Sequence, residues 1–212
     1  IDMVTPDNPN VDQNAGEQIM WESGYRSNDH GPLASATATT VTFADTVTSP
    51  DLNDTTFTVV SGTGLGQSRE VASFDSGTNT FTLERPWNVV PDTSSVLVLN
   101  RVPNHLVVYG NTLDGVQRAY AGEDHVAASC VQSYHGAVDL IVDSNTFHEM
   151  RTGISSWAPS SDENGNPTEA VYFNLYQNNT FELVRWGVSF AQAYSQTGTD
   201  ILGTVVRNNV MD

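Results

Sequence analysis

Hydrophobic residues in the C-terminal half of the chain alternate with polar ones, in short segments that return at a fixed distance. Four segments align, at 107–113, 141–147, 175–181 and 205–211. Alternation of β-branched and aromatic residues over a few positions predicts strands. Helical repeats of similar length need two amphipathic helices per unit, which these segments cannot form. The pattern therefore predicts a parallel β-solenoid over residues 102–212.

Each segment carries an asparagine at the same place. Asn111, Asn145, Asn179 and Asn209 are separated by 34, 34 and 30 residues. Asparagine tolerates the left-handed backbone conformation of a sharp bend, and its amide can hydrogen-bond to an equivalent amide one coil away. Since neighbouring strands lie about 4.8 Å apart, we expect these side chains to form an internal ladder.

Residues 33–101 interrupt this period. Their five alternating segments, separated by Gly, Asp and Pro turns, lie at 38–43, 55–60, 68–74, 79–83 and 95–99. Such a meander can close into a small antiparallel barrel or sandwich, which hides its edges. Residues 16–22 look like part of an earlier coil, so residues 1–32 are assigned to an incomplete first part of the solenoid. The predicted fold class is all-β, a parallel β-helix interrupted by a small antiparallel β module.

The repeated Val-x-x-Asn-Thr-Phe-type segments, with Gly-Ile and Gly-Val strand starts at 153–154 and 187–188, resemble the right-handed parallel β-helix proteins of the pectate-lyase-like superfamily. The resemblance implies a right-handed β-helix. The interrupting module resembles a small insert of some secreted bacterial β-helix proteins, through residues 64–69 and 85–92, which implies no activity. Arg101-Val102-Pro103 resembles the start of the Arg-x-Pro-x-x-Arg element of pectate lyases. Leu106 stands at the second Arg position of that element, so catalysis is left open.

The charge balance excludes some classes of function. Eight cations, all Arg, face 25 Asp and Glu, which gives a formal net charge of −17. Nucleic-acid binding needs a basic stripe, so no nucleic-acid partner is predicted. The longest apolar runs have four residues, whereas a membrane-spanning helix needs about 20, so no membrane insertion is predicted. A single cysteine, Cys130, leaves no intrachain disulfide.

The acidic, lysine-free composition, together with the resemblance, predicts a secreted protein, extracellular or on a cell surface. The sequence starts at Ile1 without a signal peptide, and residues 208–211 begin a strand that stops at once. Solenoids normally cover such open edges. We therefore expect the chain to be a piece of a longer protein in which the solenoid continues, or its end to be covered in a homo-oligomer.

In a solenoid, residues 34 apart become neighbours, and this places Asp114, His148 and Glu182 in one column. Carboxylates and imidazoles transfer protons, so these three are the predicted catalytic residues. Asp114 and Glu182, two coils apart, have backbones about 9.6 Å apart, compatible with the carboxyl separation of about 6.5–9.5 Å in inverting glycosidases. The alternative is structural, because a histidine between two acids relieves their repulsion.

A second column lies three residues further along each coil and consists of Gln117, Arg151 and Arg185. Arginine binds the carboxylate of a uronate or a sulfate, so these residues are predicted to bind substrate. Trp157 and Trp186 are predicted to stack on sugar rings, and filling of the coil interior is an equally good interpretation.

No cofactor or metal site is predicted, and Ca²⁺ is the one ion that the sequence suggests. Residues 162–166 follow the ligand spacing of a calcium loop, but Pro167 stands where the glycine of the sharp turn should be, so a plain surface loop is favoured. Tyr134, His135 and Asp139 form a further cluster, for which ordinary turn residues are the favoured interpretation.

Two functions remain open at this point. The first is a secreted β-helix protein that acts on or binds an extracellular polysaccharide, as a glycoside hydrolase or polysaccharide lyase would. The alternative is a non-catalytic structural or adhesive solenoid, such as a phage tailspike, an adhesin or a surface-filament subunit. Fold alone does not separate them, because function depends on the site.

Overall fold

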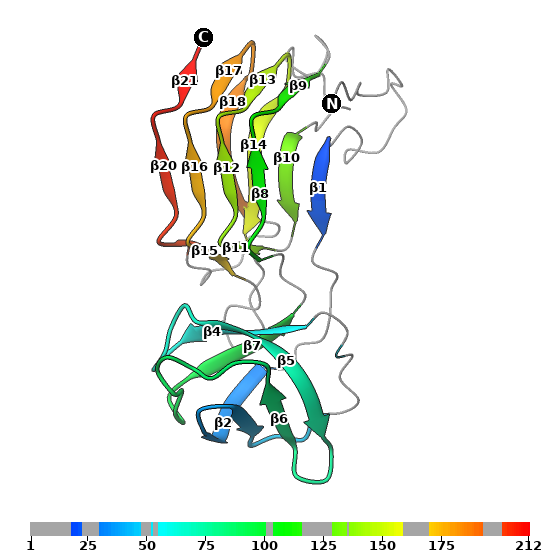
Figure 1. Cartoon of the computed structure of the whole chain (residues 1–212), viewed down its shortest axis with the longest axis vertical. Helices are drawn as coiled ribbons and strands as arrows, with labels where there is room; N and C mark the ends of the chain where they lie inside the picture. Colours follow the sequence, from blue (N-terminus) through cyan, green and yellow to red (C-terminus); the bar gives the residue numbers. More distant parts are fainter. Residues whose placement is uncertain are drawn as a thin grey trace.

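The computed structural model of the chain describes residues 18–22, 30–47, 52, 55–100, 104–115, 129–134, 136–158, 170–192 and 201–212. These residues form strands, turns and bends and contain no helix, and therefore none that could span a membrane. Two modules are visible in Figure 1, a stack of parallel strands and an antiparallel barrel. The prediction of an all-β fold with parallel sheets is confirmed.

The stacked module consists of four parallel sheets. The first contains β1 (Ile19–Glu22), β10 (Ser129–Tyr134), β14 (Thr152–Ala158) and β18 (Trp186–Gln192). The second contains β11 (Ala137–Val138), β15 (Val171–Tyr172) and β19 (Ile201–Leu202). The third contains β8 (Val107–Tyr109), β12 (Ile141–Asp143), β16 (Leu175–Gln177) and β20 (Val205–Arg207). The fourth contains β9 (Thr112–Asp114), β13 (Thr146–His148), β17 (Thr180–Glu182) and β21 (Val210–Met211).

Each coil of this β-helix visits the four sheets in turn, and strand pairing follows the sequence period (Figure 1). Phe147 of β13 lies opposite Leu113 of β9 on one side and opposite Phe181 of β17 on the other. The last step is shorter, so Phe181 lies opposite Met211, 30 residues on. The Phe147 and Phe181 rings stack inside the coils with centroids 5.0 Å apart. The predicted stacking of residues 34 apart is therefore present.

The asparagine ladder runs through the interior of the β-helix. Nδ2 of Asn111 donates to Oδ1 of Asn145 at 3.0 Å, and Nδ2 of Asn145 donates to Oδ1 of Asn179 at 3.1 Å. The left-handed residues are those before the ladder positions, with φ of 57° at Ser144 and 55° at Asn178. The expectation that the ladder asparagines themselves adopt this conformation is wrong. The preceding residue makes the bend with its side chain exposed, and the asparagine is then free to turn its amide inward.

Between β1 and β8 the chain forms a closed antiparallel barrel with the strand order β2-β3-β6-β5-β4-β7. Its strands are β2 (His30–Ala36), β3 (Thr40–Phe43), β4 (Thr56–Ser61), β5 (Ser68–Asp75), β6 (Thr80–Leu83) and β7 (Val96–Asn100). In its core, the Phe57 and Phe81 rings meet edge to face with centroids 4.9 Å apart. The sequence pattern does not predict β2, because its Gly, Pro and small residues do not alternate with large apolar ones, yet β2 closes the barrel between β3 and β7.

The barrel packs against the second sheet of the β-helix, at the end of the coils where β11 and β15 lie (Figure 1). Val60 of the barrel forms an apolar cluster with Val138 and Tyr172 of that sheet. Gly66 of the barrel also lies at this contact, with φ of +91°, and a Cβ atom there would lie 2.7 Å from Cζ of Phe173. A side chain at this position would clash with the Phe173 ring, so the glycine permits the close approach of the two modules.

Tyr176 of β16 is buried in the β-helix, where its hydroxyl lies 2.6 Å from that of Ser156. Burial raises the pKa of Tyr176 to about 12, against the opposing effect of its hydrogen bonds with Ser156 and Asn174. The folded state therefore favours the neutral phenol. The stability that the buried neutral phenol contributes is fully present below the unfolded pKa of about 10. It is lost as the pH rises through the pKa of the folded state.

We accordingly expect the urea midpoint of unfolding to fall between about pH 10 and about pH 12. Tyr176→Phe has no ionisable group at this position and should lose less stability over that range than the unmodified chain. Urea titrations of both proteins at stepped pH would measure the difference. Identical pH profiles would mean that Tyr176 titrates in the folded state as it does in water.

Candidate functional site

The predicted acidic column is assembled in the fourth sheet. Asp114, His148 and Glu182 end β9, β13 and β17, and His148 lies in register between the two acids. Nδ1 of His148 lies 3.1 Å from Oδ1 of Asp114, and 35% of the His148 side chain and 46% of the Asp114 side chain are exposed. When Nδ1 carries the proton it donates to Asp114, and Nε2 is then the basic nitrogen. This arrangement can accept and return a proton at the surface of the coils.

Arg151 and Arg185 converge on one aromatic ring. The guanidinium carbon of Arg151 lies 5.0 Å from the ring centroid of Trp186, and that of Arg185 lies 5.1 Å from it. Trp186, the first residue of β18, is 44% exposed. Nε of Arg151 is buried and has no hydrogen-bond partner among the described residues. The predicted Arg column is therefore tied to the predicted stacking residue by cation–π contacts.

Several predicted site residues lie outside what the structure describes. Gln117, the third member of the Arg column, is one, and His135 and the loop 162–167 are others. Trp157 lies on β14, but its side chain is not among those described. Among the described residues, no three His, Cys, Asp or Glu side chains are arranged to hold a metal ion.

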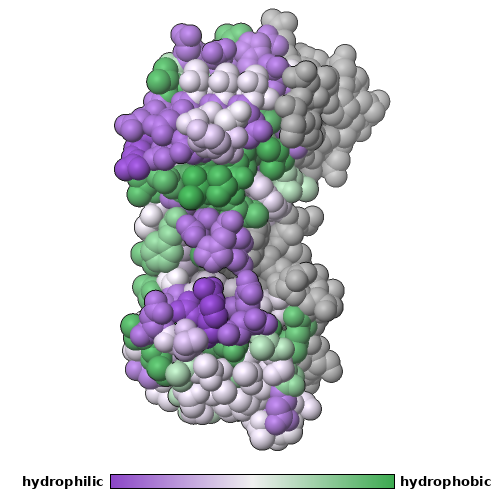
Figure 2. All heavy atoms as spheres, viewed as in Figure 1, coloured by the Kyte–Doolittle hydropathy of each residue, from purple (hydrophilic) through white to green (hydrophobic). Residues whose placement is uncertain are grey.

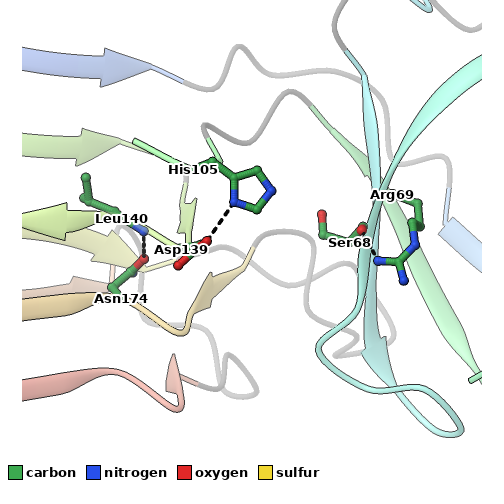
Figure 3. Close-up of polar contacts among 6 residues, drawn as sticks. All are labelled: Ser68, Arg69, His105, Asp139, Leu140 and Asn174. Atoms are coloured by element: carbon green, nitrogen blue, oxygen red, sulfur yellow. Dashed lines mark hydrogen bonds and ion pairs between the residues drawn. The ribbon is translucent and has the colours of Figure 1, made fainter. Parts of the chain in front are cut away.

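A second polar site lies where the barrel meets the β-helix. A cleft of about 580 Å³ is lined from the barrel by residues that include Arg69, Glu70 and Arg85, and from the β-helix by residues that include His105 and Asp139. Hydrophilic side chains lie on both sides of this junction in Figure 2. Figure 3 shows His105 and Asp139 on the β-helix side of this gap and Ser68 and Arg69 on its barrel side. The cleft thus combines groups of both charges from two modules.

His105 and Asp139 form the polar pair of the β-helix wall. Nδ1 of His105 lies 2.7 Å from Oδ2 of Asp139. The two residues are 34 apart, and both have left-handed backbones, with φ of 55° and 58°. The same turn position on the next coils holds Phe173 (φ 57°) and Gly203 (φ 63°). Extending the asparagine register six residues towards the N-terminus would have identified this column, since 105, 139, 173 and 203 precede 111, 145, 179 and 209 by six.

The fold and these sites define the chain as an all-β protein in which a barrel is inserted into a β-helix. No protein-family model matches the chain, and no curated protein matches it. Among solved structures, it is similar to the tailspike protein gp49 from Pseudomonas phage LKA1, with 14% sequence identity and a TM-score of 0.30. The match covers 85% of this chain and 35% of the tailspike chain. Function is therefore inferred from the sites themselves.

Proposed function

We propose that this chain belongs to a secreted right-handed β-helix protein of the pectate-lyase-like class that binds an extracellular acidic polysaccharide on the flank around Trp186. The observation that carries the proposal is the exposed Trp186 ring with Arg151 and Arg185 against it. An indole face offers a flat apolar surface to a sugar ring. The two guanidinium groups offer planar donors that match a carboxylate or a sulfate.

The charge of the protein makes this arrangement unusual. The chain carries 8 Arg against 25 acidic residues. Two of those arginines lie on one exposed aromatic side chain, and no ion pair with a carboxylate holds either of them among the described residues. Surface cations in a strongly acidic protein are readily neutralised by neighbouring acids. Two arginines that instead lie against an aromatic ring, without an ion pair, favour recognition of an external anion.

The acidic column extends the proposal from binding to cleavage. Asp114 orients His148, and Glu182 follows one coil later on the same sheet. A carboxylic acid at Glu182 would protonate a departing glycosidic oxygen, while the His148–Asp114 pair would take a proton from water or from a sugar carbon. These are the roles that the hydrolase and lyase forms of the proposal assign to the three residues.

The binding proposal is tested with polygalacturonate and with a neutral glucan of similar length, by titration calorimetry. We expect Arg185→Gln and Trp186→Ala each to weaken polygalacturonate binding by at least about tenfold, equivalent to about 1.4 kcal/mol. Arg207→Gln removes the same charge from β20, where Arg207 donates to Gln177, and is the matched control. Equal affinity for the neutral polymer, or equal losses in all three variants, would contradict the proposal.

The proposed cleavage activity is tested with the variant Glu182→Gln. If the column is catalytic, this variant should bind polygalacturonate like the unmodified chain but release no reducing ends and no unsaturated product absorbing in the ultraviolet. Its folding should hardly change, because substitutions at partly exposed sites usually alter stability by about 0.5 kcal/mol or less. Binding without product from the unmodified chain would assign a binding protein. Absence of both would favour the alternative, a structural or adhesive solenoid.

A further inference from the structure

We propose that the cleft between the barrel and the β-helix is a second carbohydrate site, which binds a uronate sugar unit with its carboxylate on Arg69 and Arg85. This site is separate from the flank around Trp186 and does not depend on it. The cleft measures about 580 Å³, within the range of about 300–1,000 Å³ that is typical of small-molecule sites.

Arg69 is held in place by the barrel. Its Nε donates to the carbonyl of Pro86 at 2.8 Å, its Nη1 to the carbonyl of Ser68 at 2.6 Å, and its Nη2 to Oδ1 of Asn88 at 3.1 Å. Its guanidinium carbon also lies 5.4 Å from the ring centroid of Trp87. One N–H on each terminal nitrogen remains for a ligand. A guanidinium fixed in this way loses little conformational freedom on binding, which favours affinity.

Arg85 brings a second positive charge to the same wall. Burial and the repulsion of Arg85 both lower the pKa of Arg69, as expected when two cations are close together. Glu70 also lines the cleft, but among the described residues no carboxylate forms an ion pair with either arginine. Two neighbouring guanidinium groups that form no ion pair with a described carboxylate favour an anion from solution.

The opposite wall indicates a sugar acid in preference to a small inorganic anion. Asp139, paired with His105, can accept hydrogen bonds from the hydroxyls of a sugar, which sulfate lacks. Phe173 on the same wall is 45% exposed and adds an aromatic ring to the lining of the cleft. An arginine wall facing a carboxylate and an aromatic ring matches a ligand that carries one carboxylate, several hydroxyls and an apolar ring face. Uronates are such ligands.

Packing fixes the distance between the two walls. Gly66 allows the barrel to rest against Phe173, and the cluster of Val60, Val138 and Tyr172 joins the modules beside the cleft. A cleft between two modules that are packed together is formed before the ligand arrives. Ligand binding therefore does not lose free energy to ordering the two modules.

The test is calorimetry with a galacturonate disaccharide, carried out in the Trp186→Ala background so that the other flank does not contribute. We expect binding, no binding of the matching neutral disaccharide, and a loss of at least about tenfold on Arg85→Gln. Arg85 makes no hydrogen bond among the described residues, so its replacement should leave the fold intact; Arg207→Gln is the control for charge.

Three results would overturn the assignment. One is no binding of the uronate disaccharide, another is unchanged affinity in Arg85→Gln, and the third is inorganic sulfate binding as tightly as the sugar acid, which would make the cleft a simple anion site. Failure of the Trp186 proposal would appear separately, as unchanged polygalacturonate binding when Trp186→Ala is added to Arg85→Gln, in which the cleft has lost one arginine. The two proposals can therefore fail independently.

Discussion

Asn179→Ala is expected to destabilise the β-helix by about 3 kcal/mol, because it removes a fully buried amide that makes four hydrogen bonds. Oδ1 of Asn179 accepts from the backbone N–H and from Nδ2 of Asn145, at 3.0 and 3.1 Å. Nδ2 of Asn179 donates to the Val142 carbonyl and to Oδ1 of Asn209, each at 3.0 Å. Alanine leaves the Asn145 N–H without its acceptor in a buried place, and each such group costs about 1–3 kcal/mol.

Asn111→Ala is the matched control at the edge of the ladder. Asn111 is half-buried, and its backbone N–H, which alanine retains, still donates to Oδ1 of Asn145 at 2.9 Å. We expect a cost of about 1 kcal/mol for this variant. Urea unfolding curves would measure both. Equal losses in the two variants would show that the ladder contributes through turn conformation alone and not through buried hydrogen bonding.

The coil register could be predicted from the sequence because one physical requirement repeats in every coil. Each coil needs an inward amide at the ladder position and an inward apolar residue two positions later, as at Asn145 and Phe147. Sequence alone could not assign the bend, since both Asn178 and Asn179 are of a residue type that accepts left-handed backbone. Only the burial of Asn179 decides which of them turns the chain.

The two candidate sites differ in how much of each could be predicted from the sequence. Arg151, Arg185 and Trp186 follow from the 34-residue register, although their contact over the indole ring depends on side-chain rotamers that no periodicity specifies. The cleft is harder to predict, because Arg69 lies on β5 whereas Arg85 lies two residues beyond the end of β6, the antiparallel neighbour of β5. Their position against His105 depends on how the barrel docks on the β-helix, and a single sequence carries no periodic signal for that contact.

Phe147→Ala is expected to cost about 3–5 kcal/mol, the usual penalty for deleting a buried aromatic side chain. Phe147 is fully buried, and its ring stacks on Phe181 of the next coil. In a β-helix such a cavity cannot collapse easily, because backbone hydrogen bonds to both neighbouring coils hold the strand at a fixed spacing. Phe190→Ala removes the same side chain where it is 39% exposed and stacks on Tyr176 with centroids 6.1 Å apart. Phe190→Ala should therefore cost about 1 kcal/mol. Urea titrations would measure the loss of stability in both variants. Comparable losses would mean that the aromatic column is not the centre of the core.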